Sequence, residues 1–411
     1  MTANDTITSS AAAKVGPIRV SENGRFFVDG RGQPFFWLGD TQWQLVRDFT
    51  LEEADTIIDD RKRKGFTVLQ VMLTGVGNGT RPNLNGHTPW LNHDPSTPNE
   101  AYFEHVDAVL QRALMKGLIV VLGVFHQLHR AHITTENARK YARWVAQRYR
   151  DNPNIIWSMY PAARQEFIPV VRELAAGLQE ESDHLITVHP DPSPASSSFI
   201  HDESWLACNM IQTWAHLKTI FPMVTEDYHR EPIKPVVLAE GAYETPFDTK
   251  EYGFVITPLL MRRQAYWSYL LGAGHTYGHT DFWKWPADWR AALGAPGAFQ
   301  MGVLKRILTS CDWWNLVPDA SILTDQTDSD MPLNAAARSQ SGDWVLVYLG
   351  DPTTVSVRMS SITGGNPVDA SWINPQTGDS SSIGIMPNTG ARSFATPDGW
   401  EDAVLLLKKR D

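Results

Sequence analysis

Polar side chains suited to acid–base or sugar-binding chemistry recur where apolar stretches of this chain end. Glu240 is the clearest case, because it directly follows the apolar run PVVLA. A carboxylate at such a point is partly removed from water, and burial is one way in which enzymes tune a carboxyl group as acid, base or nucleophile. The alternative for Glu240 is a structural ion pair with an arginine across the same opening.

The ends of other apolar runs carry carboxylates, imidazoles, amides and aromatic rings. Lysine and arginine are scarce among these positions, so the set suits a neutral polyhydroxylated ligand better than a phosphate. Sixteen tryptophans agree with sugar binding, although most Trp side chains fill the core of a protein. We therefore predict a carbohydrate substrate, bound by residues at the ends of the runs: Asp40, Gln42, Trp43, His126, Gln212, Trp214, Tyr243, Tyr277 and His279.

Histidine spacing raises the alternative of a metal site. His126, His129 and His132 are three residues apart, and His275 and His279 are four apart. No HExxH motif or pair of aspartates accompanies them, so we predict neither a metal nor a cofactor. A Ser-His-Asp hydrolase is disfavoured because the chain has no GxSxG motif.

Eight apolar strands separated by helical segments must position these side chains. Thr50 and Glu53 have capping-box spacing at the start of the first helix. Strands that are apolar on both faces indicate a parallel sheet covered by helices. Eight such units predict a (β/α)8 TIM barrel over residues 18–316, with an N-terminal β-hairpin, and its active site at the C-terminal ends of the strands. The strands are FFWLGD, TVLQVML, LIVVLGVF, NIIWSMYP, HLITVHP, WLACNMIQTW, PVVLAEGAYE and GHTYGHTDFW.

The pattern changes after Val317, where short alternating strands separated by Gly, Asn, Asp and Pro replace the helical period. This predicts a small C-terminal β-sandwich over residues 317–411, packed against the barrel with help from the hairpin. Residues 1–17 read as a disordered tail without the features of a signal peptide, which predicts a cytoplasmic protein. The pattern does not define an oligomeric state.

Composition excludes several classes of partner. The net charge of −10 argues against nucleic acid and anionic membranes. No apolar run approaches the ~18 residues of a membrane span. The two cysteines, Cys208 and Cys311, are too few for a disulfide framework and are expected to be buried.

Several motifs resemble the apiosidase-like glycoside hydrolases, namely glycoside hydrolase family 140 and its relatives. They are NGRFFVDGRGQPFFWLGDTQWQL, RKRKGFTVLQVML, DPSTPNEAYFEHVD, RYRDNPNIIW, KPVVLAEGAYE, RRQAYWSYLLGAGHTYGH and ALGAPGAFQMGVLK. The C-terminal part resembles the β-domain that follows in this family, which carries a collagen-binding label; we expect a buttress there and not collagen binding. The resemblance implies a (β/α)8 barrel that hydrolyses a glycosidic bond in a plant or microbial glycan or glycoside, with terminal apiose as the best-known target.

The resemblance also implies an acid/base residue after the fourth strand and a second carboxylate on the seventh. Glu240 matches the second position. The first is W-x-x-G-G-D in the family, whereas this chain has Ala162 in the place of the acid. We adopt the hypothesis that Glu166 or Asp191 is the replacement acid and that Glu240 is the nucleophile or base.

The sequence also allows two other interpretations of Ala162. One is a different linkage or chemistry, and the other is a non-catalytic sugar-binding protein. Whether hydrolysis retains or inverts configuration depends on whether the two carboxyl groups lie ~5–5.5 Å or ~6.5–9.5 Å apart.

Overall fold

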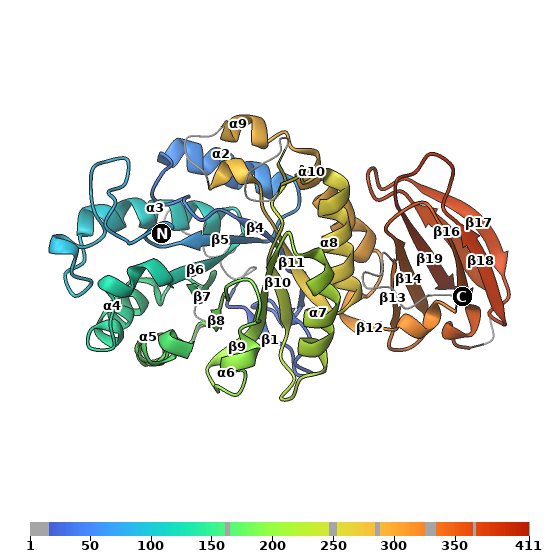
Figure 1. The fold of residues 1–411 in the computed structure, drawn as a ribbon, viewed down its shortest axis with the longest axis horizontal. Helices are drawn as coiled ribbons and strands as arrows, with labels where there is room; N and C mark the ends of the chain where they lie inside the picture. Colours follow the sequence, from blue (N-terminus) through green and yellow to red (C-terminus); the bar gives the residue numbers. More distant parts are fainter. Residues whose placement is uncertain are drawn as a thin grey trace, which may run out of the picture.

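The computed structural model describes residues 16–160, 165–245, 253–283, 288–324, 334–364 and 367–410. Figure 1 shows a barrel surrounded by helices and, beside it, a separate domain of β-sheet. Helix α8 (Pro258–Leu270) lies between the barrel strands and the sheet domain.

Eight parallel strands close into a barrel in chain order, which confirms the predicted architecture. The first and last strands pair, with Tyr277 opposite Asp40. The strands are β4 (Leu38–Thr41), β5 (Val68–Met72), β6 (Ile119–His126), β7 (Ile155–Tyr160), β8 (Ile186–Val188), β9 (Leu206–Trp214), β10 (Val236–Gly241) and β11 (Ala273–Tyr277).

Side chains alternate between the barrel interior and the helix layer. Val68, Ile119, Ile156 and Val237 belong to one buried apolar cluster inside the barrel. Leu38, Ile211 and Leu238 belong to a second cluster, which packs outward against the helices. This alternation of period two decides which strand-end residues can face the mouth of the barrel.

Helices cover the outside of the barrel. The predicted capping box is present at the start of α2, where Thr50 and Glu53 exchange hydrogen bonds with each other's backbone. The chain leaves this helix through Gly65, whose φ of +92° favours glycine. Besides α8, the helices are α2 (Leu51–Arg63), α3 (Glu100–Met115), α4 (Ala138–Tyr149), α5 (Ile168–Glu181), α6 (Ser197–Ile200), α7 (Ile220–His229), α9 (Trp289–Ala292) and α10 (Pro296–Leu308).

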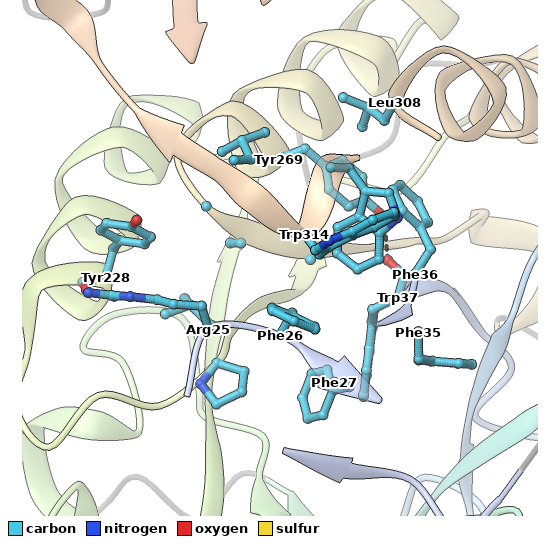
Figure 2. A pocket seen from close by; sticks show the side chains of 17 residues that line it. Arg25, Phe26, Phe27, Phe35, Phe36, Trp37, Tyr228, Tyr269, Leu308 and Trp314 are labelled. Carbon is cyan, nitrogen blue, oxygen red and sulfur yellow. Dashed lines mark hydrogen bonds between the residues drawn. The ribbon is translucent and has the colours of Figure 1, made fainter. Parts of the chain in front are cut away.

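The N-terminal hairpin closes the end of the barrel away from the active-site mouth. It consists of β1 (Arg19–Val20), β2 (Phe27–Val28) and β3 (Pro34–Phe35). Phe27 packs on Trp37 with ring centroids 5.1 Å apart, and both belong to the interior cluster. A pocket lined by aromatic rings remains between this hairpin, β10, β11 and the start of the sheet domain (Figure 2).

The C-terminal domain consists of two packed sheets, as expected. The six-stranded sheet runs β12 (Leu316–Pro318), β13 (Asn334–Ser339), β14 (Trp344–Leu349), β19 (Ala403–Lys409), β16 (Val368–Ile373) and β17 (Ser380–Met386). The second sheet pairs β15 (Thr354–Arg358) with β18 (Ala391–Ala395). One face of β14 enters the core between the sheets, and the other packs on the barrel helices.

A buried ion pair joins the two domains. Arg262 on α8 donates to both carboxylate oxygens of Asp402, at 2.7 and 2.8 Å. The hydroxyl of Tyr348 donates to the same carboxylate at 2.8 Å. Phe26 of the N-terminal hairpin packs edge-on against Trp313, which precedes β12, with ring centroids 6.0 Å apart.

Both cysteines are free and buried, as expected. Within the described ranges, no helix is long and apolar enough to cross a membrane.

Candidate active site

A β-bulge directs Glu240 into the mouth of the barrel. Leu238 lies opposite Ile211 and Glu240 opposite Gln212, so β10 has one extra residue, Ala239, at this point. Ala239 belongs to the interior cluster, and the bulge lets the next side chain face inward as well. Gly241 then faces outward, where an added Cβ would lie 2.5 Å from the Oε1 atom of Gln264.

Two side chains, one at the end of β9 and one just after β8, contact the Glu240 carboxylate. The indole Nε1 of Trp214 donates to Oε1 at 3.1 Å. The Nε2 atom of His189 lies 3.5 Å from Oε2. Burial lowers the pKa of His189 to about 3, so this imidazole is neutral at pH 7 and the contact is not an ion pair.

Aromatic rings form the wall around this carboxylate. Tyr160 stacks on His126 with centroids 5.0 Å apart, and meets the His189 ring at 4.4 Å and the Trp43 ring at 5.3 Å. Trp43 donates from Nε1 to the hydroxyl of Tyr243 at 2.9 Å. The wall is therefore rigid and aromatic.

Burial keeps the wall uncharged at neutral pH. It lowers the pKa of His126 to about 4. It raises the pKa of Tyr160 well above the ordinary value, and the negative charges of Glu240 and Asp191 raise it further. Gln212 adds an amide that donates to the Tyr160 hydroxyl at 3.4 Å. Neutral donors, acceptors and rings around one carboxylate suit a neutral sugar.

A groove of about 550 Å³ opens beside Glu240, within the ~300–1,000 Å³ range of small-molecule sites. Its residues come from the ends of β7 and β9 and from the segments that follow β6, β8 and β9: Gln127, Tyr160, Asp191, Pro192, Ser193, Pro194, Phe199, Trp214 and His216. Tyr160 and Trp214 belong both to this groove and to the surroundings of Glu240, so the two spaces are continuous.

The structure places the two candidates for a general acid differently. Asp191 lines the groove, and its charge acts on the Tyr160 hydroxyl. Glu166 is exposed on the short helix η3 (Gln165–Phe167) and does not line the groove. Pro161 and Ala162 lie outside the described residues.

Five of the predicted ligand residues lie around Glu240: Trp43, His126, Gln212, Trp214 and Tyr243. The other four lie outside the barrel, between its strands and the helices: Asp40, Gln42, Tyr277 and His279. Asp40 is fully buried and accepts hydrogen bonds from Arg61 of α2 at 2.8 Å and from Gln42 at 2.6 Å. An aspartate that binds an arginine between strand and helix does not reach the mouth.

The two candidates from β11 and its following segment belong to the same outer layer. The Tyr277 hydroxyl donates to Glu244 at 2.5 Å. Glu244 also accepts from the backbone N–H of Gly297 at 3.1 Å, at the start of α10. His279 accepts from the backbone N–H of Asp281 through Nδ1, which caps the short helix η5 (Thr280–Phe282).

Sequence reasoning did not single out Tyr160 and His189. Both stand at strand ends, since Tyr160 is the last residue of β7 and His189 directly follows β8. The same end-of-strand rule that selected Glu240 would have found them.

No group of three or more potential metal-binding side chains occurs in the part of the chain that the structure describes. His129 is instead engaged locally: its Nδ1 accepts from the backbone of His126 at 3.0 Å, and its Nε2 lies 3.1 Å from the Thr74 hydroxyl.

Two family models match this chain, one over the barrel and one over the sheet domain. Residues 21–315 match the family model described as "Apiosidase-like, catalytic domain". The chain belongs to the apiosidase-like family. Residues 317–408 of this apiosidase-like protein match a second model, described as "Putative collagen-binding domain of a collagenase".

Solved structures resemble the apiosidase-like chain over nearly its whole length. A glycoside hydrolase superposes with a TM-score of 0.88 at 26% identity, covering 96% of this chain and 98% of the other. A glycoside hydrolase of family 5 from Bacteroides vulgatus gives 0.87 at 25% identity, covering 96% and 94%. No curated protein matches the sequence.

A more distant structure shares the fold alone. It is a β-glucanase from Saccharophagus degradans in complex with cellotetraose, with a TM-score of 0.51 at 12% identity, covering 72% of this chain and 96% of the other. The family match and the two nearer structures make the apiosidase-like chain a glycoside hydrolase. They give no support to the alternative of a non-catalytic sugar-binding protein.

Proposed function

We propose that this glycoside hydrolase removes a neutral terminal sugar, with Glu240 as the catalytic carboxylate. The observation that carries the proposal is the bulge in β10, which turns one buried carboxylate into a mouth otherwise walled by neutral rings and amides. A carboxylate so placed can attack the anomeric carbon directly or activate a water for that attack.

The sugar would lie between Glu240 and the wall formed by Trp43, His126 and Tyr160. Aromatic faces bind the C–H faces of a sugar ring, and the imidazole and amide groups of the wall can hydrogen-bond its hydroxyls. A small neutral sugar such as terminal apiose, for which the family is named, agrees with this uncharged site.

Asp191 is the better placed of the two candidates for the general acid. It lines the groove that adjoins Glu240, where the leaving group of the substrate would lie. Glu166 has an exposed side chain outside that groove. We therefore assign the acid role to Asp191 as part of the proposal.

The decisive experiment measures hydrolysis by wild type and Glu240→Gln on aryl apiosides, arabinofuranosides, rhamnosides, glucosides and xylosides, together with natural oligosaccharides. We expect turnover of at least one substrate by wild type and a loss of about 10²–10⁴-fold in Glu240→Gln. Glu226→Gln, which neutralises an exposed carboxylate on α7, is the control and should behave as wild type. Equal activity of Glu240→Gln and wild type would refute the role of Glu240.

The acid is identified by changing the leaving group. A dinitrophenolate departs without a proton, so Asp191→Asn should keep nearly the wild-type kcat/KM on a dinitrophenyl glycoside, since kcat/KM reports the step in which the leaving group departs. The same variant should lose about 10²–10⁴-fold on the methyl glycoside, whose leaving group needs a proton. If Glu166→Gln shows this pattern and Asp191→Asn does not, Glu166 is the acid.

A further inference from the structure

We propose that the groove beside Glu240 is the leaving-group site and that it selects a flat phenolic aglycone in preference to a second sugar. This inference rests on the proposed function, because it deepens what the same site recognises. The groove shares Tyr160 and Trp214 with the surroundings of Glu240, so a group bound in it lies next to the bond that breaks.

The lining of the groove fits a flat ring. Three aromatic side chains, Tyr160, Phe199 and Trp214, and two prolines, Pro192 and Pro194, form most of its wall. Rings and prolines offer rigid apolar faces that bind an aromatic group at a low entropic cost.

Backbone strain is concentrated at two residues of this groove. Trp214 has a φ of +45° and Ser193 a φ of +41°, a left-handed conformation that is unusual for residues other than glycine, asparagine and aspartate. Such conformations are energetically costly and cluster at active sites and ligand-binding segments. At Trp214 the strained backbone presents an indole that is 36% exposed while its Nε1 stays bonded to Glu240.

The basicity of the leaving group also favours a phenolic aglycone. Hydrolysis breaks the bond between the anomeric carbon and the aglycone oxygen, which keeps the electron pair and takes up a proton, while a water supplies the hydroxyl that ends on the anomeric carbon. A phenol has a pKa of about 10, far below that of a sugar hydroxyl, so it leaves with less help from an acid. The sequence has Ala162 where the family's acid is expected, and a phenolic leaving group tolerates that change best.

The test compares three glycosides that share one sugar and differ in the leaving group: methyl, 4-methylumbelliferyl and a second sugar. Each substrate is compared with itself across wild type, Phe199→Ala and Trp214→Ala, so its intrinsic reactivity cancels. We expect both variants to lose about threefold to tenfold in kcat/KM on the 4-methylumbelliferyl glycoside, as for the loss of an aromatic contact. Phe199→Ala should lose clearly less on the methyl glycoside than on the 4-methylumbelliferyl glycoside, because a methyl group does not reach the groove that Phe199 lines.

Trp314→Ala is the matched control. Trp314 is 38% exposed, close to the value for Trp214, but it lines the aromatic pocket near the hairpin (Figure 2). This variant should behave as wild type on all three substrates. Equal losses by Phe199→Ala on the methyl and aryl glycosides, or a larger loss on the disaccharide than on the aryl glycoside, would overturn the inference.

A binding measurement separates this inference from the proposed function. Free 4-methylumbelliferone should bind wild type saturably in calorimetry, with weaker binding in Phe199→Ala and Trp214→Ala and unchanged binding in Trp314→Ala. If no glycoside is turned over, the proposed function fails, whatever the binding shows. If glycosides are hydrolysed but the phenol does not bind, only the selection of a phenolic aglycone fails.

Discussion

Buried neutral histidines characterise this molecule at the scale of single residues. Burial lowers the pKa of His189 and of His275 to about 3, and that of His126 to about 4. In the mouth this neutrality serves recognition, since a neutral imidazole both donates and accepts hydrogen bonds. It also links the stability of the fold to pH.

The sign of that linkage follows from the depressed pKa values. In the unfolded chain a histidine takes up its proton near pH 6.5, whereas His275 in the folded state stays neutral until about pH 3. Between these values the unfolded state binds more protons, so the free energy of unfolding decreases as the pH falls, by about 1.4 kcal/mol per pH unit for each such group.

His275→Leu tests this linkage at a position outside the mouth. Neither ring nitrogen of His275 has a hydrogen-bond partner among the described residues. We expect the free energy of unfolding of the variant, measured by urea titration from pH 4.5 to 6.5, to depend on pH less steeply than that of wild type by about 1.4 kcal/mol per pH unit. Parallel curves for the two proteins would mean that the pKa of His275 in the fold is not lowered.

At the scale of elements, irregularities of the strands decide which side chains face the mouth. The bulge at Ala239 turns Glu240 inward, and Gly241 follows with its backbone against Gln264 of α8. The Gln264 amide bonds the backbone of Ala242 as both donor and acceptor, at 2.9 and 3.0 Å. The position of Glu240 is therefore fixed from outside the barrel.

Gly241→Ala tests this dependence. The added Cβ would approach the Oε1 atom of Gln264 to 2.5 Å, so either the buried Gln264 side chain must move, which disturbs its hydrogen bonds to Ala242, or β10 must shift. We expect a stability loss of about 1–3 kcal/mol from overpacking and a lower kcat with little change in KM. Gly294→Ala, whose nearest contact at 3.3 Å is a backbone oxygen, is the milder control. An unchanged kcat in Gly241→Ala would mean that the geometry of the bulge does not affect catalysis.

The sequence could predict the eight strands because each is an apolar run bounded by helix and turn signals. It could predict Glu240 because a carboxylate directly after PVVLA stands out. It could not show the side of the wall that each strand end faces, since one extra residue in a bulge reverses the alternation. Asp40 and Tyr277 stand at strand ends just as Tyr160 does, but they face α2 and Glu244.

At the scale of the whole molecule, the barrel and the sheet domain share one buried surface. Trp344, Leu346 and Tyr348 of β14 belong to the same apolar cluster as Met261 and Ala265 of α8. Figure 1 shows α8 facing the six-stranded sheet. We infer that the C-terminal domain supports the barrel, and that α8, which bonds the segment after Glu240 through Gln264, connects this support to the active site.

The Arg262–Asp402 pair at this surface allows a test of the coupling. Asp402→Ala leaves the Arg262 guanidinium, 1% exposed, without its bidentate partner, which should cost about 3–5 kcal/mol. Replacing both residues by Met and Leu should recover part of that stability, because two apolar side chains carry no desolvation penalty, although the Tyr348 hydroxyl then loses its acceptor. Calorimetry should show one unfolding transition for wild type, shifted down in Asp402→Ala and partly restored in the double variant. A transition that instead splits in Asp402→Ala, with the activity lost only in the upper one, would show that the barrel folds and works without its C-terminal domain.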